Sequence, residues 1–159
     1  MNLYGLIGFP LSHSFSKKYF TEKFKKENIN DASYELFEID KVTKLRSIIR
    51  QNKNLRGLNV TIPYKQQVMP FLNYIEPAAK KIGAVNVLKI TQDGKLEGYN
   101  TDYYGFIESL KTFLEGKMPS KAAILGTGGA SKAVKIALDH LKIPIMNFDY
   151  LKNEYTSRG

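Results

Sequence analysis

A glycine-rich turn lies between an apolar strand and a helix near the end of this 159-residue chain. The strand is predicted over Ala122–Leu125 and the helix over Ser131–Leu141, with Gly126-Thr127-Gly128-Gly129-Ala130-Ser131 between them. Small residues there would let the backbone approach a pyrophosphate, which the partly positive helix N-terminus stabilises. One interpretation is therefore a dinucleotide site formed by Gly126, Gly128, Gly129, Ala130 and Ser131. The other is an ordinary tight turn between a strand and a helix.

Short apolar strands alternate with amphipathic helices along the rest of the chain. Strands are predicted at Leu3–Phe9, Tyr34–Ile39, Leu58–Ile62, Ala84–Ile90 and Lys95–Tyr99, and helices at Ser14–Asn28, around Val42–Ile49, and at Asp102–Leu114. The last two strands flank Gln92-Asp93-Gly94, which is typical of a hairpin turn. This alternation predicts an α/β protein with a mostly parallel sheet and flanking helices, followed by a partial Rossmann-like dinucleotide-binding domain.

The pattern changes near Gly116–Pro119, where we expect a second domain to begin. We therefore expect a first domain over residues 1–101, a linking helix and linker over 102–119, and a partial nucleotide domain over 120–159.

The composition limits the possible partners. Lys and Arg number 24 against 15 Asp and Glu, so the net charge is +9. This charge can reflect a solvated lysine-rich surface, or it can serve to attract anionic small molecules. The positive charge forms no arginine-rich arm and no aromatic-and-basic module, so a nucleic-acid partner is not expected. The chain contains no cysteine, which excludes disulfides and cysteine-ligated zinc, and its two histidines, His13 and His140, argue against a multi-histidine metal site.

Hydrophobic residues make up 43% of the chain and charged residues 25%, as in ordinary globular proteins. No apolar run approaches the ~18 residues of a membrane span. The Met1–Phe9 segment also lacks the charged leader of a signal peptide. We therefore expect a soluble, cytoplasmic protein without a membrane partner.

Polar side chains gather where the predicted strands end, which is where open α/β sheets bind ligands. They are Ser12, Ser14 and Ser16 after the first strand, Asn59, Thr61 and Lys65 at the third, Asn86 in the hairpin, and Asp102 at a helix start. Each also has an ordinary structural interpretation, because serines and acids cap helices and a buried amide can bond neighbouring backbone. Lys65 can likewise be an exposed lysine at a helix start. Taken singly, these residues leave ligand binding and structural roles open.

Together, five ordered motifs resemble those of shikimate dehydrogenases. They are Gly8-Phe9-Pro10-Leu11-Ser12-His13-Ser14-Phe15-Ser16, Asn59-Val60-Thr61-Ile62-Pro63-Tyr64-Lys65, Gly83-Ala84-Val85-Asn86, Gly98-Tyr99-Asn100-Thr101-Asp102 and the glycine turn. The resemblance runs from residue 3 to about residue 141. It implies a two-domain enzyme of aromatic amino-acid biosynthesis that interconverts 3-dehydroshikimate and shikimate with NADPH and NADP.

The resemblance also implies roles for individual residues. Ser14 and Ser16 would hold the substrate carboxylate, and Thr61, Asn86 and Asn59 would position its hydroxyls and the lysine. Lys65 and Asp102 would form the catalytic pair, with Lys65 acting as a general base or as a stabiliser of developing alkoxide charge. Gly126, Gly128, Gly129, Ala130 and Ser131 would bind the pyrophosphate of the cofactor.

Several positions depart from the family pattern. Lys17 replaces a common proline, Val87 a common threonine, and Tyr103 and Tyr104 replace smaller residues. After a further predicted strand, Ile143–Phe148, Asp149 favours NAD, whereas Arg158 with Ser157 suits the 2′-phosphate of NADP.

The chain stops at Gly159, before the rest of a nucleotide domain, and we expect it to be incomplete. The first interpretation is an NADP-dependent shikimate dehydrogenase. The alternatives are an NAD-preferring quinate/shikimate dehydrogenase and a non-catalytic shikimate-binding fragment.

Overall fold

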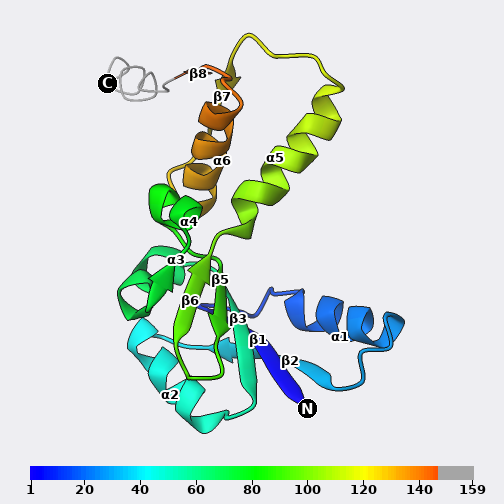
Figure 1. Cartoon of the computed structure of the whole chain (residues 1–159), viewed down its shortest axis with the longest axis vertical. Helices are drawn as coiled ribbons and strands as arrows, with labels where there is room; N and C mark the ends of the chain where they lie inside the picture. The colour runs from blue at the N-terminus through cyan, green and yellow to red at the C-terminus, as the bar shows by residue number, and fades with distance from the viewer. Residues whose placement is uncertain (147–159) are drawn as a thin grey trace, which may run out of the picture. The chain divides into compact units, whose positions relative to one another are not determined.

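A computed structural model describes residues 1–146. Their contacts divide the chain into two units, the first formed by residues 1–80 and 84–100, and the second by residues 81–83 and the chain from Thr101 onward. Figure 1 draws the first unit in blue to green and most of the second in yellow-green to orange. Across the described residues, no helix is long and apolar enough to cross a membrane.

The first unit is built on one six-stranded sheet with the strand order β2-β1-β3-β5-β6-β4 (Figure 1). Its strands are β1 (Asn2–Gly8), β2 (Ala32–Glu38), β3 (Leu55–Val60), β4 (Tyr74–Ile75), β5 (Val87–Ile90) and β6 (Leu96–Tyr99). The pairs β1–β2, β1–β3 and β4–β6 are parallel, and β5 is antiparallel to both of its neighbours. The prediction of a mostly parallel α/β sheet is confirmed.

Helices cover both faces of this sheet. They are α1 (Ser16–Lys26), the short 3-10 turn η1 (Val42–Lys44) leading into α2 (Leu45–Gln51), α3 (Tyr64–Gln67), the 3-10 turn η2 (Met69–Phe71) and α4 (Pro77–Ile82). Because side chains alternate along a strand, β1 directs Leu6 toward α1 and Ile7 toward the opposite face. Leu6 packs with Tyr34 and the rings of α1, whereas Ile7 packs with Leu45 and its neighbours from α2.

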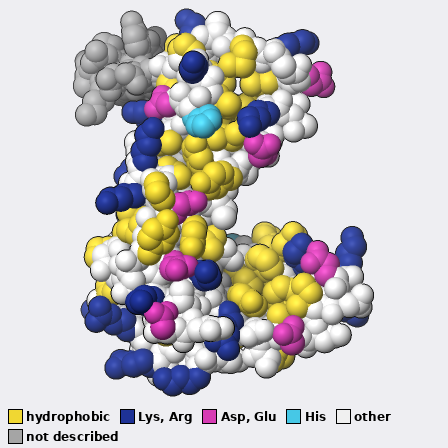
Figure 2. Space-filling view, in the orientation of Figure 1, with side chains coloured by type: hydrophobic (Ala, Val, Ile, Leu, Met, Phe, Trp, Pro, Cys, Tyr) yellow, Lys and Arg dark blue, Asp and Glu magenta, His cyan; other side chains and the backbone are white. Residues whose placement is uncertain are grey.

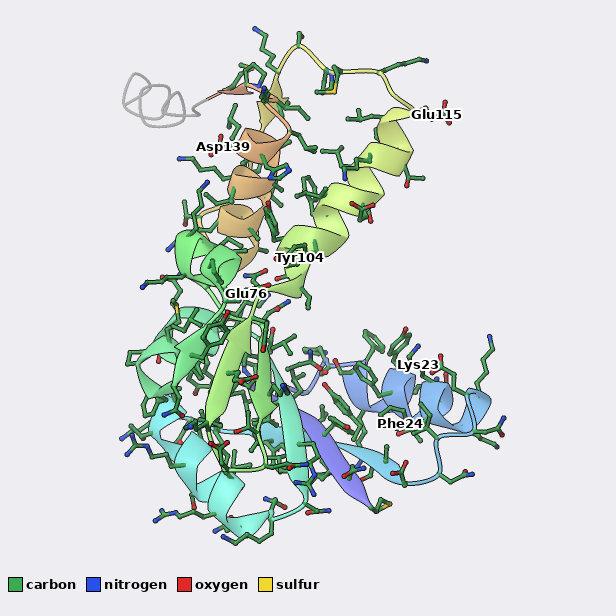
Figure 3. All side chains as sticks on the ribbon, viewed as in Figure 1. Lys23, Phe24, Glu76, Tyr104, Glu115 and Asp139 are labelled. Carbon is green, nitrogen blue, oxygen red and sulfur yellow. The ribbon has the colours of Figure 1, made fainter. Side chains whose placement is uncertain are left out.

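Helix α1 is amphipathic in the way its sequence predicts. Phe20 and Phe24 pack against the cluster of Leu6, Leu11 and Tyr34, and Figure 3 shows Phe24 on the side of α1 that faces the strands. Lys23 pairs instead with Glu27 one turn along, with 2.7 Å between Nζ and Oε1. Hydrophobic side chains gather on α1 and on the strands beside it in Figure 2.

The predicted hairpin is present between β5 and β6. Gly94 has a φ of +78°, a conformation that favours glycine, and the Thr91 amide donates to the Lys95 carbonyl at 3.0 Å. The prediction places this strand from Ala84, but β5 begins at Val87, and Ala84 to Asn86 form a buried segment leading into it.

The second unit contains α5 (Thr101–Leu114), β7 (Ala122–Ala123), α6 (Gly129–His140) and β8 (Ile145–Met146). Helix α5 contacts α6, and the Tyr103 hydroxyl lies 3.1 Å from Nδ1 of His140. Strands β7 and β8 pair in parallel, as expected of a strand–helix–strand unit. The contacts group the predicted linking helix with the second unit, whereas Asp149, Ser157 and Arg158 lie outside the described residues.

Candidate active site

The polar motifs of the first unit meet at one edge of its sheet. Strands β1, β3 and β6 end there at Gly8, Val60 and Tyr99, and the antiparallel β5 starts there at Val87. Segments far apart in the sequence are thus brought to the edge where open α/β sheets bind ligands.

A cavity of about 710 Å³ opens at this edge. Six of the predicted polar residues line it: Ser14, Ser16, Asn59, Thr61, Lys65 and Asn86. Ser12 is not among its lining residues, although it lies on the same loop as Ser14. Phe9, Phe15 and Ile62 supply part of the apolar wall. The volume suits a small molecule, and an apolar wall with a few convergent polar groups is typical of ligand pockets.

Backbone hydrogen bonds hold the loop after β1 against the loop after β3. The Thr61 amide donates to the Ile7 carbonyl at 3.0 Å, and the Phe9 amide donates to the Ile62 carbonyl at 3.1 Å. The two loops approach closely at Gly8, where an added Cβ would overlap Cγ2 of Thr61. A glycine is therefore required at this position to bring Thr61 next to the loop that carries the serines.

Asn86 is fixed by its neighbours on both sides. Its carbonyl accepts from the Val60 amide at 2.8 Å, and its own amide donates to the Tyr99 carbonyl at 3.0 Å. The Val85 amide donates to the Lys65 carbonyl at 2.7 Å, which ties α3 to the same segment. These bonds explain why Lys65 and Asn86, 21 positions apart in the chain, line one cavity.

The two serines have different surroundings. Helix α1 begins at Ser16 and its N-cap position is Phe15, which makes no side-chain cap bond. The Ser14 hydroxyl accepts a hydrogen bond from the Ser16 amide at 3.3 Å, so it has a turn-forming role as well as its place in the cavity. The alternative of a structural role for Ser14 therefore stays open beside ligand binding.

Asp102 lies in the first turn of α5, which belongs to the second unit. Lys65 belongs to the first unit, so the catalytic pairing of Lys65 with Asp102 stays a prediction. Within the same motif, Asn100 has a structural contact that the sequence did not indicate: its Nδ2 donates to the Ala84 carbonyl at 2.9 Å.

The glycine turn joins β7 to α6 in the predicted order, although β7 ends at Ala123 rather than Leu125 and α6 begins at Gly129 rather than Ser131. Gly126 has a φ of +117°, a conformation that favours glycine, and Gly128 is the N-cap residue of α6. The Ser131 hydroxyl donates to the Gly128 carbonyl at 2.7 Å, so this side chain closes the turn. A Cβ added at Gly126 or Gly128 would meet open space, so the backbone of the turn is accessible to a ligand.

A cavity of about 350 Å³ adjoins this turn. Gly126, Thr127 and Ser131 line it together with Lys132 and Lys135 of α6. The two lysines were not among the predicted cofactor residues, although their place in the helix after a glycine turn could have indicated them. Accessible backbone, a helix N-terminus and two cations form a suitable environment for phosphate groups.

Comparison with known proteins identifies the fold family. The family model for the shikimate dehydrogenase substrate-binding domain matches residues 6–88, more than half of the chain. The chain belongs to this family. The matched segment includes every predicted residue that lines the larger cavity.

The similarity to individual shikimate dehydrogenases extends beyond the residues that the family model matches. The NADP(+) shikimate dehydrogenase of Clostridium beijerinckii is 50% identical over 143 residues, covering 88% of this chain and 52% of that protein. Shikimate dehydrogenase 1 of Peptoclostridium difficile has a TM-score of 0.79 at 41% identity, covering 91% of this chain and 53% of that one.

The Thermus thermophilus enzyme, solved in complex with NADP(H) and shikimate, has a TM-score of 0.77 at 32% identity, covering 91% of this chain and 54% of that one. The chain thus spans about half the length of the relatives it matches.

Proposed function

We propose that the first unit binds shikimate and 3-dehydroshikimate, and that the second unit contributes to NADP binding in a shikimate dehydrogenase. The observation that supports this most strongly is the single cavity that collects Ser14, Ser16, Asn59, Thr61, Lys65 and Asn86. These residues come from three separate motifs, and each matches a position to which the family resemblance assigns a role in substrate binding or catalysis.

The polar groups of the cavity suit an acidic polyol. Serine hydroxyls donate to a carboxylate without adding charge, and the amides of Asn59 and Asn86 can donate to and accept from ring hydroxyls. Lys65 adds a positive charge to the same cavity, which favours an anionic ligand. The net charge of +9 would further attract such a molecule at low ionic strength.

The second cavity suits the pyrophosphate of a dinucleotide. The residues that would hold it are those of the glycine turn: Gly126, Gly128, Gly129, Ala130 and Ser131. Of these, Gly126 and Ser131 line the cavity, together with Lys132 and Lys135. When bound, NADP would supply the group that accepts or returns a hydride at the substrate carbon. NAD stays the alternative cofactor, because the residues proposed to distinguish the two lie outside the described part of the chain.

Oxidation of the substrate alcohol also requires removal of the hydroxyl proton. We assign this task to Lys65, which either accepts the proton at Nζ or stabilises the alkoxide as it forms. Asp102, the other member of the proposed pair, would share in this proton transfer. Both roles predict that Lys65 acts mainly on turnover.

A binding-only function is the second candidate. Its support is that every residue lining the larger cavity belongs to the first unit, so the proposed substrate site does not include the glycine turn. Such a protein would bind shikimate in the larger cavity without catalysing its oxidation. The cytoplasmic location expected from the composition stays a prediction under either function.

Two measurements test these proposals. Calorimetric titration of shikimate into the chain, with quinate as the comparison ligand, should show preferential binding of shikimate. Formation of NADPH from shikimate, with NAD in a parallel assay, then separates a dehydrogenase from a binding protein. Absence of shikimate binding would contradict both candidate functions, and faster turnover with NAD or quinate would favour the alternative enzyme.

Replacement of Lys65 tests its role in any turnover that is observed. Lys65→Ala should lower kcat much more than it raises KM, as expected of a group that acts in the transition state. An unchanged kcat would remove Lys65 from the reaction.

A further inference from the structure

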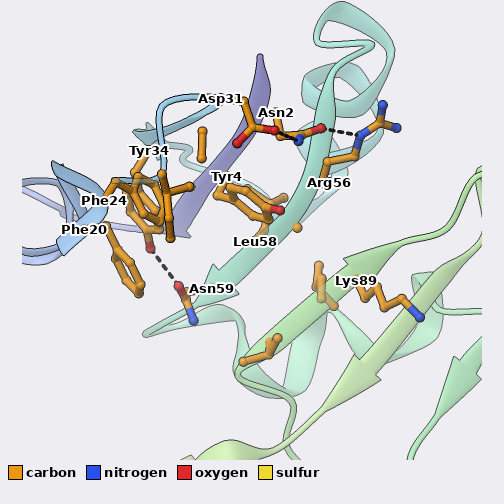
Figure 4. Close-up of a pocket in the computed structure, with 16 residues that line it drawn as sticks. Asn2, Tyr4, Phe20, Phe24, Asp31, Tyr34, Arg56, Leu58, Asn59 and Lys89 are labelled. Atoms are coloured by element: carbon orange, nitrogen blue, oxygen red, sulfur yellow. Dashed lines mark hydrogen bonds between the residues drawn. The ribbon is translucent and has the colours of Figure 1, made fainter. Parts of the chain in front are cut away.

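Asn59 lines the larger cavity, and a side chain outside that cavity fixes its orientation. The Tyr34 hydroxyl donates to Oδ1 of Asn59 at 2.8 Å (Figure 4). The Asn59 amide accepts hydrogen bonds at Oδ1 and donates them at Nδ2. Because Oδ1 is bonded to Tyr34, Nδ2 must point away from that tyrosine. Figure 4 shows Nδ2 of Asn59 pointing away from Tyr34. Asn59 therefore keeps its donor end for another partner.

Tyr34 is held rigidly enough to impose this orientation. It is only 3% exposed, and its ring stacks on Phe20 with 4.4 Å between the ring centroids and an interplanar angle of 12°. Leu6 and Leu11 pack in the same cluster. Burial raises the pKa of Tyr34, and hydrogen bonding with Ser16 works against that rise. The hydroxyl therefore keeps its proton and remains a donor at neutral pH.

Tyr34 also connects two of the proposed substrate residues. Its hydroxyl bonds to Asn59 at the end of β3, and it interacts with Ser16 at the start of α1. Tyr34 also lines a second, mainly apolar cavity of about 400 Å³, and Asn59 and Phe20 line both cavities. Tyr34 thus contacts two residues that line the proposed substrate site without lining that site itself.

We propose that Tyr34 is a positioning residue for shikimate, acting through Asn59. Its hydroxyl turns the amide so that Nδ2 donates to an acceptor oxygen of the bound ligand. This assignment rests on the proposed function of the cavity. Tyr34 is not recognisable from the sequence, because nothing in a strand-forming tyrosine 25 positions before Asn59 indicates a shared hydrogen bond.

Tyr34→Phe tests the assignment because it keeps the ring and its stacking and removes only the hydroxyl. Without that donor, the Asn59 amide can rotate and present the wrong end to the ligand. Loss of one such orienting bond should weaken shikimate binding by about 3- to 10-fold. Tyr4→Phe is the matched control, since Tyr4 is the register partner of Tyr34 on β1 and has no hydrogen bond to Asn59 or Ser16 among the described contacts.

A double-mutant cycle separates positioning from a general loss of stability. In an Asn59→Ala background, Tyr34→Phe should change the Kd of shikimate by less than about 2-fold, because the group it orients is gone. An equal loss in both backgrounds, or no loss with Asn59 present, would overturn the assignment. Urea unfolding of each variant checks that the first unit remains folded.

NMR of the unchanged chain provides a second, independent measurement. Shikimate should shift the side-chain amide signals of Asn59, and Tyr34→Phe should shift or broaden them while Tyr4→Phe leaves them unchanged. Unaltered Asn59 signals in Tyr34→Phe would overturn the assignment. If the unchanged chain fails to bind shikimate at all, the proposed function itself fails, an outcome distinct from equal binding by the unchanged chain and Tyr34→Phe.

Discussion

Ser14 illustrates how one side chain can serve both the loop and a ligand. Its hydroxyl oxygen accepts a hydrogen bond from the Ser16 amide, which leaves the hydroxyl proton available for donation. Because the side chain lines the cavity, that proton can be donated to a carboxylate without breaking the turn. Structural and ligand-binding roles are therefore compatible at this residue.

Ser14→Ala should weaken shikimate binding while the chain stays folded. A hydrogen bond to a charged group contributes about 1.5–3 kcal/mol, so the Kd should rise by roughly tenfold or more. Calorimetric titration measures this change. Ser12→Ala is the matched control, because Ser12 lies on the same loop but does not line the cavity, and its Kd should be unchanged. Equal Kd values for the two variants would assign Ser14 to the turn alone.

Asp93 provides a pH-dependent feature of the β5–β6 hairpin. Its carboxylate lies 2.8 Å from Nζ of Lys95 and accepts a bond from the Thr91 hydroxyl at 2.5 Å. The Lys95 contact, followed by the Thr91 bond, lowers the pKa of Asp93 from 3.8 to about 2. Because the folded-state pKa is lowered, the ionised Asp93 carboxylate stabilises the folded hairpin. This contribution is fully present above about pH 4 and is lost as the pH falls toward 2.

NMR titration of the Asp93 carboxyl carbon should therefore give a pKa of about 2 in the folded chain. Lys95→Gln removes the largest cause of the shift, so the Asp93 pKa should rise toward 3.8, the ordinary value for this group. High salt should move it in the same direction, since the ion pair is exposed. A midpoint near 3.8 in the unchanged chain would show that the ion pair does not form in solution.

At the scale of elements, the pairing of β1 with β2 depends on a glycine. A Cβ added to Gly5 would lie 2.5 Å from the Glu35 carbonyl oxygen and 2.6 Å from the Phe37 ring. The backbone oxygen cannot move without disturbing the β1–β2 ladder. Gly5→Ala should therefore lower the free energy of unfolding by about 1–3 kcal/mol, measured by urea denaturation.

Gly105→Ala is the matched control for this substitution. Gly105 lies inside α5, and an added Cβ there meets nothing within 4 Å. Alanine favours a helix over glycine, so this variant should be more stable by about 0.5–1 kcal/mol. If both variants unfold at the same urea concentration, an added Cβ at Gly5 does not destabilise the β1–β2 pairing.

Sequence patterns predicted the long elements better than the short ones. The apolar face of α1 and the Asp93-Gly94 turn are local signals, and both elements formed within a few residues of their predicted bounds. The two-residue strand β4 and the short helix α4 went unpredicted, because they depend on contacts with distant segments. Beside β4, for example, the Asn73 side chain accepts a hydrogen bond from the Leu96 amide at 2.9 Å, a tertiary contact that no local pattern indicates.

The candidate site shows the same division. Gly8, Asn59, Thr61 and Asn86 were recognisable because their motifs are contiguous in the chain. Tyr34 and the lysines of α6 were missed, because their proposed roles depend on how β2 and β3 each align with β1 between them and on a helix face. Register is fixed by packing of the whole sheet, which no single segment encodes.

At the scale of the molecule, two ligands should protect two different parts of the chain. The larger cavity is formed entirely within the first unit, and the cavity at the glycine turn lies within the second. A ligand that binds only the folded form of a unit suppresses its opening in proportion to ligand concentration over Kd. Protection by shikimate and by NADP should therefore appear on different peptides.

Hydrogen-exchange mass spectrometry measures this directly. Shikimate at about 100 times its Kd should slow amide exchange by up to about 100-fold, or ~2.7 kcal/mol, in β1, β3 and the loops that follow them. NADP should slow exchange in β7, the glycine turn and the start of α6. Quinate and NAD serve as comparison ligands at equal concentration. Protection by shikimate confined to the second unit would contradict the placement of the substrate site, because none of its lining residues lies there.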